Sequence, residues 1–244
     1  MLKFAMALCA GLLSFGAPVL AQTAVPTAPP VAPAVTPDNV LHLDLSTGGR
    51  VSIQLRPDVA PQHVARIKAL AKQGFYNGVM FHRVIEGFMA QTGDPTGTGT
   101  GGSPLPDVKA EFNGLPHVRG AVSAARSDSP DSANSQFFIV FSPRLTLDGK
   151  YSVFGRVIGG MQYVDAIERG EPPATPSRIV KASIGSDNAP LPTAEEIAAA
   201  MARQPDPVVQ AQAPAPSASP APAAAPAPAA SAPAEQPQTP ATQR

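Results

Sequence analysis

Large apolar side chains are spread unevenly along the 244 residues, and this distribution limits which part of the chain can fold. Eight of the ten Phe lie between Phe75 and Phe154, whereas the stretch from Gln204 to Arg244 holds eleven Pro and no Phe, Tyr, Leu or Ile. A segment without large apolar groups cannot bury enough surface to offset the entropy lost on ordering. We therefore expect residues 204–244 to form a disordered Pro/Ala-rich tail and residues 22–37 to form a Pro/Ala-rich linker.

Residues 1–21 have the layout of an export signal. Lys3 supplies a positive charge, Phe4–Phe15 is an apolar run, and a cut after Ala21 would release the rest of the chain. The run is shorter than the roughly 20 residues that span a bilayer as a helix, although a membrane anchor is the alternative interpretation. The pattern is typical of a secretory signal peptide. It predicts an exported protein, with the periplasm as its destination and no stable membrane insertion after signal removal.

Composition and spacing argue against several classes of chemistry. Cys9 is the only cysteine and lies in the predicted signal, so we expect no disulfide, thiol nucleophile or thiolate metal site in the mature chain. Lys+Arg and Asp+Glu both number 18, without the basic surplus that nucleic-acid binding requires. The four His lack the spacing of metal ligands. No Gly-x-Ser-x-Gly elbow marks a hydrolase, although composition leaves a Ser-His-Asp triad open.

One Gly-rich stretch, Gly97-x-Gly99-x-x-Gly102, matches a dinucleotide-binding fingerprint by letter. That fingerprint needs a βαβ unit around it, with a helix directly after the glycines. Pro104 and Pro106 prevent such a helix. We therefore expect a flexible Gly/Thr loop.

The pattern of residues 38–187 predicts one domain that is mainly β. Alternating apolar residues flank Gly48 and Gly49, which is typical of a β-hairpin. A helix that begins at Pro61 and a second over Met161–Arg169 have apolar residues at helical spacing. Short strand-like runs complete the set, and eight strands can close into a barrel whose interior is filled by side chains. The eight expected strands are Val40–Leu45, Val51–Leu55, Val79–Ile85, Phe88–Thr92, Ala121–Ala125, Phe137–Phe141, Val153–Val157 and Ile179–Ile184.

Residues 188–203 form a short extension between this domain and the tail. Thr193 followed by Glu196 is a capping-box pattern. It predicts a helix that continues to about Arg203. That helix either docks on the domain or simply precedes the tail.

Arg83 is the residue in the domain that a purely structural interpretation explains least well. Alternation from Phe81 places Arg83 on the same face as Phe81 and Ile85. A charged group on an apolar face is costly without a function or a partner, the alternative being a barrel-rim Arg that reaches water. The segment Phe81–Asp94 shares its mixture of polar and large apolar residues with two later segments, Asn134–Ile139 and Leu147–Gly155.

Together these three segments resemble the cyclophilin family of peptidyl-prolyl cis–trans isomerases, and the resemblance runs from about Val40 to Gly185. It implies a closed eight-stranded antiparallel barrel with two α-helices. It also implies an isomerase without cofactor or metal that acts, as a monomer, on proline-containing polypeptides such as unfolded or partly folded exported proteins. The alternative function is a non-catalytic proline-segment binding module, or holdase chaperone, built on the same groove.

The resemblance also implies roles for individual residues. Arg83 corresponds to the catalytic arginine of the family. The proline ring would be held in a pocket of Phe88, Met89, Phe138 and Leu147. The remaining substrate-binding positions are His82, Gln91, Ala125, Arg126, Gln136 and Tyr151, with Gln91 and Gln136 holding the substrate backbone and Arg126 contributing only its main chain.

Some positions depart from the family pattern. Glu86 stands where many members have Pro, and Tyr151 where many have His. Thr146 stands where eukaryotic members carry a Trp that contacts the inhibitor cyclosporin, so we expect weak cyclosporin binding. The tail contains Ala-Pro bonds, including Ala213-Pro214, that either reach the groove or belong to a spacer.

Overall fold

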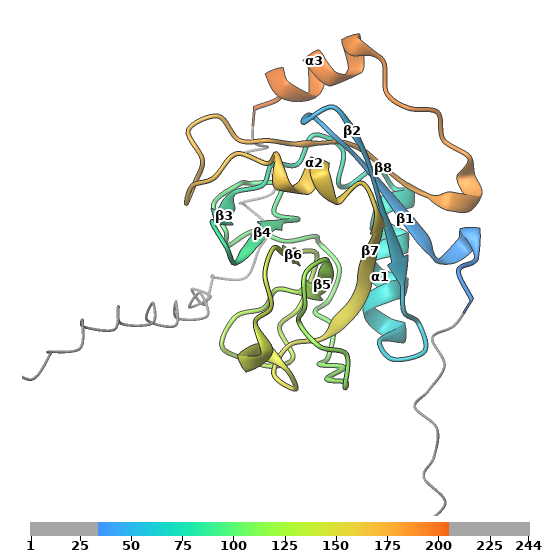
Figure 1. Cartoon of the computed structure of the whole chain (residues 1–244), viewed down its shortest axis with the longest axis vertical. Helices are drawn as coiled ribbons and strands as arrows, with labels where there is room; N and C mark the ends of the chain where they lie inside the picture. The colour runs from blue at the N-terminus through green and yellow to red at the C-terminus, as the bar shows by residue number, and fades with distance from the viewer. Residues whose placement is uncertain (1–33, 205–244) are drawn as a thin grey trace, which may run out of the picture. The chain divides into compact units, whose positions relative to one another are not determined.

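The computed structural model describes residues 34–204 (Figure 1). The predicted signal peptide, most of the predicted linker and the tail after Gln204 lie outside the described residues. Within this range, no helix has the length and apolarity needed to cross a membrane. The strands are β1 (Val40–Leu45), β2 (Gly49–Leu55), β3 (Arg83–Ile85), β4 (Met89–Thr92), β5 (Ala121–Ala124), β6 (Phe137–Val140), β7 (Val153–Gly159) and β8 (Ile179–Ile184). The helices are α1 (Pro61–Lys72), α2 (Met161–Asp165) and α3 (Ala194–Ala202), with short 3₁₀ turns at Pro37–Asn39, Leu145–Leu147 and Gly185–Asp187.

All eight strands belong to one antiparallel sheet in the order β3-β4-β6-β5-β7-β2-β1-β8. The predicted hairpin is confirmed: β1 pairs with β2 in a register that runs from Val40 opposite Gln54 to Leu45 opposite Gly49. Along β2, buried and partly exposed residues alternate. This alternation is expected for a strand with one face toward the core.

The expected closed barrel is wrong, because the sheet is a half-barrel with β3 and β8 as its two ends. In the described part of the chain, an isolated bridge between Met80 and Arg178 joins the two sides instead of a continuous ladder. The predicted strand Val79–Ile85 becomes regular only at Arg83. Residues 79–82 are all buried, without the alternation of a strand that has one face toward the core. The segment resembles a strand in sequence because all of it lies in the core.

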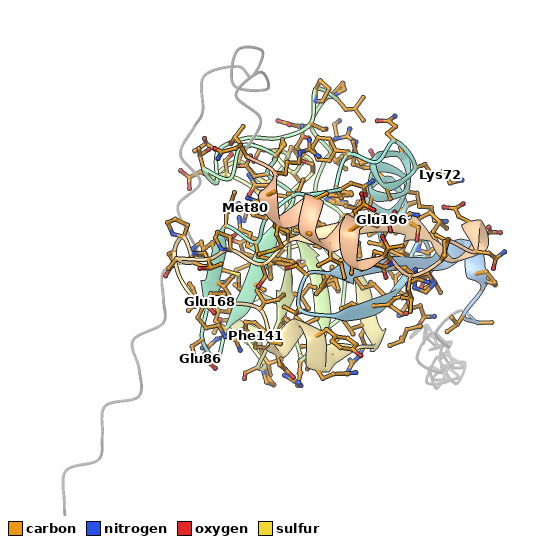
Figure 2. All side chains as sticks on the ribbon, turned by 90° about the horizontal axis from the view of Figure 1, so that it is seen from above. Lys72, Met80, Glu86, Phe141, Glu168 and Glu196 are labelled. Carbon is orange, nitrogen blue, oxygen red and sulfur yellow. The ribbon has the colours of Figure 1, made fainter. Side chains whose placement is uncertain are left out.

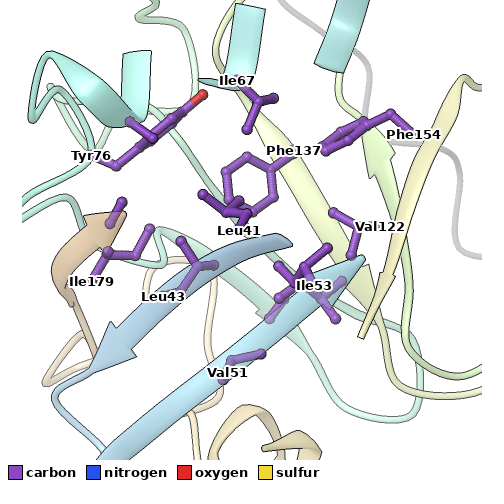
Figure 3. Close-up of a cluster of buried hydrophobic side chains, with 14 of the residues drawn as sticks. Leu41, Leu43, Val51, Ile53, Ile67, Tyr76, Val122, Phe137, Phe154 and Ile179 are labelled. Atoms are coloured by element: carbon purple, nitrogen blue, oxygen red, sulfur yellow. The ribbon is translucent and has the colours of Figure 1, made fainter. Parts of the chain in front are cut away.

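The main core lies between the curved sheet and α1. The residues predicted to share one face of α1, Val64, Ile67, Leu70 and Ala71, are all buried. Figure 3 shows side chains of β1 and β2 meeting those of α1 and β6 around the ring of Phe137. This packing fixes β6, whose next residue, Phe138, faces the opposite cluster.

Within residues 34–204, the two helices expected in the domain are α1 and α2, and α3 is the helix predicted in the extension. Helix α2 ends at Asp165, four residues before the predicted Arg169. Helix α3 begins at the predicted capping box, in which Glu196 N donates to Thr193 Oγ1 and Thr193 N donates to Glu196 Oε2 (Glu196 is labelled in Figure 2). Arg203 Nη1 donates to the carbonyl oxygen of Asn77 at 2.6 Å. The extension therefore docks on the domain.

Candidate functional site

A cavity of about 300 Å³ opens where β3, β4 and β6 meet the loops that follow β4, β5 and α2. One side is apolar and the other carries polar and charged groups. Its lining residues are His82, Arg83, Phe88, Met89, Gln91, Gly97, Thr98, Gly99, Thr100, Ala125, Arg126, Phe138, Tyr151, Glu171 and Pro172.

Nine of the eleven predicted site residues line this cavity, although they come from four separate parts of the sequence. Gln136 and Leu147 lie behind the lining. Sequence reasoning missed Glu171 and Pro172, and it interpreted Gly97–Thr100 only as a loop. The nine are His82, Arg83, Phe88, Met89, Gln91, Ala125, Arg126, Phe138 and Tyr151.

The apolar side of the cavity belongs to a second buried cluster, separate from the main core. Phe88, Met89, Phe138 and Leu147 are members of this cluster and are at most 7% exposed. The Phe138 ring meets Tyr151 edge to face, with centroids 5.9 Å apart. Edge-to-face packing of this kind holds aromatic rings in a defined orientation. Phe88, Met89 and Phe138 therefore form a rigid apolar surface of the cavity, and Leu147 belongs to the cluster that supports it.

A buried polar chain supports Phe138 from behind. His117 stacks on Phe138 at 6.2 Å between centroids. One His117 ring nitrogen lies 3.1 Å from Ser123 Oγ and the other 2.8 Å from Asp148 Oδ1. These are the contacts of a Ser-His-Asp triad, but Ser123 and His117 are completely buried. A hydrolase nucleophile must reach its substrate. The hydrogen-bonded side chains of Ser123, His117 and Asp148 are therefore a structural support for the pocket.

Arg83 enters the cavity from β3 with its donors divided between two sides. Nε donates to Glu171 Oε2 at 2.7 Å. Nη1 is buried and has no hydrogen-bond partner among residues 34–204. An unpaired buried donor is costly unless another molecule supplies the acceptor. The Nη1 group is therefore the cavity atom best suited to bind an acceptor from a ligand.

Two glutamines connect the cavity to the loop beside it. Gln91 Nε2 donates to Gln136 Oε1 at 2.8 Å. Gln136 Nε2 in turn donates to the carbonyl oxygens of Gly99 and Gly101, at 3.0 and 2.8 Å. Gln136 thus acts on the cavity through Gln91 and the loop.

The Gly/Thr loop is organised by one buried carboxylate. Asp94 accepts hydrogen bonds from the backbone N–H groups of Thr96, Gly99 and Gly101 and from the Thr96 hydroxyl. Burial acts to raise the pKa of Asp94, but these hydrogen bonds and the nearby His82 outweigh it and hold the pKa below its usual value. Gly99 has a φ of +86°, a region that favours glycine. The expected loop is therefore held in place by its hydrogen bonds to Asp94.

His82 forms the wall between Arg83 and this loop. It is 5% exposed, and neither ring nitrogen has a hydrogen-bond partner in the described range. Burial lowers the pKa of His82, the positive charge of Arg83 lowers it further, and Asp94 opposes both effects. A neutral imidazole at this position leaves Arg83 as the positive group next to the apolar pocket.

Arg126 and Tyr151 close the opposite end. The Arg126 guanidinium lies 4.6 Å from the centre of the Tyr151 ring. Its nitrogens also donate to the carbonyl oxygens of Ser127, Asp128 and Lys150. These contacts join the Arg126 side chain to the separate loop that holds Lys150 and Tyr151. No cluster of three or more metal-ligating side chains occurs within residues 34–204.

Comparison with known proteins places this geometry in a family. Residues 42–184 match the family model described as cyclophilin type peptidyl-prolyl cis-trans isomerase/CLD. A probable peptidyl-prolyl cis-trans isomerase of Brucella suis is 49% identical over 167 residues, covering 62% of this chain and 85% of the relative. Peptidyl-prolyl cis-trans isomerase B of Bacillus subtilis is 43% identical over 129 residues, covering 52% of this chain and 89% of the relative.

Solved structures agree with this placement. A crystallised cyclophilin from Hirschia baltica has a TM-score of 0.59 and 33% identity, covering 64% of this chain and 77% of its own. A cyclophilin type isomerase from Cryptosporidium parvum, crystallised in the presence of the dipeptide Ala-Pro, has a TM-score of 0.56 and 29% identity over 59% of this chain and 98% of its own. The family match spans more than half of the sequence and includes every strand that contributes to the cavity. The chain therefore belongs to the cyclophilin-type peptidyl-prolyl cis–trans isomerases.

Proposed function

We propose that this isomerase accelerates rotation about X-Pro bonds in exported proteins, as a monomer, with Arg83 as its catalytic residue. One observation supports the assignment above all: the buried Nη1 donor of Arg83 and a rigid apolar pocket share a single cavity. The Nη1 donor can form a hydrogen bond to an acceptor on the substrate, and the apolar pocket can hold a proline ring.

The reaction requires only groups that bind the substrate. The X-Pro bond populates both isomers because its trans preference is about 0.5–1 kcal/mol. Exchange is nevertheless slow, since rotation breaks amide resonance and meets a barrier of about 18–20 kcal/mol. Rotation makes and breaks no covalent bond. A catalyst must therefore bind the twisted amide more tightly than either planar isomer.

Arg83 meets this requirement through charge and position. In the twisted amide the prolyl nitrogen regains a localised lone pair, which accepts a hydrogen bond that the planar amide does not. A guanidinium can donate to it and stays protonated. A hydrogen bond to a charged group contributes about 1.5–3 kcal/mol, which corresponds to roughly 10- to 100-fold in rate.

The other predicted site residues would hold the substrate while the bond rotates. The pocket of Phe88, Met89, Phe138 and Leu147 would fix the proline ring, which leaves the preceding carbonyl group free to rotate. Gln91, supported by Gln136, would hold the substrate backbone without adding charge. His82, Ala125, Arg126 and Tyr151 would form the walls along which the flanking residues lie.

The proposed substrates are exported, proline-containing polypeptides. This part of the proposal is supported by the signal-peptide pattern of residues 1–21. Expression of the full chain in a double-membraned bacterial host tests it. We expect the mature protein in the periplasmic fraction, with a new N-terminus at Gln22 by mass spectrometry. An uncut chain in the cytoplasm or the membrane would overturn the export assignment.

The activity test compares the mature chain with Arg83→Ala. NMR exchange spectroscopy on a short Ala-Pro peptide measures cis–trans exchange directly. We expect strong acceleration by the wild type and a loss of at least tenfold in Arg83→Ala, with unchanged thermal unfolding. A folded wild type that binds the peptide without accelerating exchange would instead identify a proline-segment binding module. A variant as fast as the wild type would remove Arg83 from the mechanism.

A further inference from the structure

The loop after α2 is fastened to the outer edge of β3, next to Arg83. Val84 N donates to Gly170 O at 2.8 Å, and Gly170 N donates to Val84 O at 2.9 Å. A side chain at Gly170 would meet the Pro173 backbone at 2.6 Å, and its φ is +146°. Position 170 therefore requires glycine, and the paired backbone places the next residue, Glu171, beside the side chain of Arg83.

Glu171 uses this placement to hold one side of the guanidinium. Its Oε2 accepts from Arg83 Nε at 2.7 Å. The Arg83 side chain is 17% exposed, whereas Glu171 is 52% exposed. A flexible four-bond side chain is thereby restrained at Nε, one bond away from the carbon that carries the two terminal nitrogens. The Nη1 donor remains buried and unpartnered among the described residues.

We propose that Glu171 is a positioning residue for Arg83: its carboxylate occupies Nε and holds the guanidinium plane so that Nη1 points at the prolyl nitrogen of the bound substrate. The inference rests on the proposed catalytic role of Arg83. It adds a residue 88 positions away in sequence, brought to the cavity by the pairing of Gly170 with Val84.

The expected effect lies in kcat. The Arg83 contact forms with the twisted amide, so disordering the donor weakens the transition state rather than substrate binding. Ordering one rotamer-rich side chain corresponds to about a threefold to tenfold change in rate. The ion pair is partly exposed and contributes little to folding stability. Removal of Glu171 should therefore lower kcat and leave KM and thermal unfolding nearly unchanged.

The experiment measures kcat and KM of the mature chain on a saturable Ala-Pro peptide for Glu171→Ala and Glu171→Gln. Glu86→Gln is the matched control. Glu86 accepts from Arg169 Nε at 2.8 Å, is 77% exposed and lies at the edge of the molecule outside the cavity (Figure 2). We expect the threefold to tenfold loss of kcat in Glu171→Ala, a smaller loss in Glu171→Gln, which keeps an acceptor, and wild-type values in Glu86→Gln.

A double-mutant cycle separates positioning from other effects. In an Arg83→Ala background, Glu171→Ala should cause no further loss of kcat. Equal losses in both backgrounds would show that Glu171 acts without Arg83, and a change confined to KM would make it a binding residue. An unchanged or higher kcat in Glu171→Ala would also overturn the proposal.

A spectroscopic readout keeps this inference distinct from the proposed function. The Nε–H signal of Arg83 should be shifted and protected from solvent exchange in the wild type, and both properties should be lost in Glu171→Ala, which has no acceptor. Absence of isomerase acceleration would overturn the proposed function, while this signal still decides whether Glu171 holds the guanidinium. A signal identical in wild type and variant would overturn the positioning role whatever the activity.

Discussion

Arg83 and Gln91 lie directly opposite each other as cross-strand partners of β3 and β4, and both side chains line the same cavity. Gln91 is linked through Gln136 to the carbonyl oxygens of Gly99 and Gly101. The strand register therefore places the proposed catalytic donor opposite the residue that is linked to the Gly/Thr loop. Loss of Gln136 should therefore affect the cavity, although Gln136 itself does not line it.

Replacement of Gln136 by Ala should raise KM and spare kcat. The change removes the two hydrogen bonds from Gln136 to the loop and the one to Gln91, while the hydrogen bonds from the loop to Asp94 remain. A net hydrogen-bond contribution of about 0.5–1.5 kcal/mol converts to roughly a twofold to tenfold increase in KM. Steady-state kinetics on an Ala-Pro peptide measures both constants. A loss confined to kcat would contradict the supporting role assigned to Gln136.

Stability should fall as the pH drops below about 6.5, the ordinary pKa of histidine. Burial lowers the pKa of His42, His82 and His117 in the folded protein. The unfolded chain then binds more protons than the native one between the lowered pKa values and 6.5. Stability from these groups is fully present above pH 6.5 and is lost as the pH falls toward the folded-state values.

Urea unfolding at pH 7.5, 6.5 and 5.5 measures this dependence. The variant His82→Gln should flatten it, because His82 has no hydrogen-bond partner in the described structure and its replacement removes a titration rather than a bond. Stability that is equal at pH 7.5 and 5.5 in the wild type would refute the prediction.

Cyclosporin should inhibit this isomerase weakly. Thr146 is exposed beside Leu147 of the proline pocket and lacks the surface of the Trp that eukaryotic relatives have there. Thr146→Trp should strengthen inhibition by roughly tenfold or more, since a buried aromatic anchor often dominates a binding interface. An inhibition titration compares the two proteins. Tight binding by the wild type would overturn the assignment of position 146.

Truncation after Gln204 should leave KM for an Ala-Pro peptide unchanged, because a Pro/Ala-rich segment is expected to act as a spacer. The cut keeps Arg203 and its bond to Asn77, so α3 stays docked. Kinetics of the mature and truncated chains decide the matter. A lower KM after truncation would mean that the Ala-Pro bonds of residues 204–244 compete for the cavity.

Local sequence patterns predicted the elements whose buried face follows from the spacing of apolar residues along the chain. The β1–β2 hairpin follows from strict alternation around Gly48 and Gly49, and α1 follows from apolar spacing at Val64 and Ile67. The pattern misled at Val79–Ile85, where continuous burial resembles a strand but the chain folds inward before Arg83. Barrel closure depends on how β3 and β8 approach each other, which no local pattern records.

The sequence predicted only those residues of the candidate site that lie within the family motifs. Arg83, Phe88 and Gln91 lie within one short segment with a distinctive mixture of residue types. Glu171 lies in a loop of ordinary composition, and its place beside Arg83 depends on the backbone pairing of Gly170 with Val84. Asp94 works through backbone N–H groups, which carry no sequence signature.

That pairing of Gly170 with Val84 also bears on solubility. A sheet that does not close leaves edge strands whose free N–H and C=O groups can recruit another chain and seed aggregation. At β3, Val84 gives both of these groups to Gly170, and the strand is only three residues long. The segment that brings Glu171 to the cavity thus also covers one exposed edge of the half-barrel, so its removal would expose the backbone groups of Val84 to pairing with a second chain.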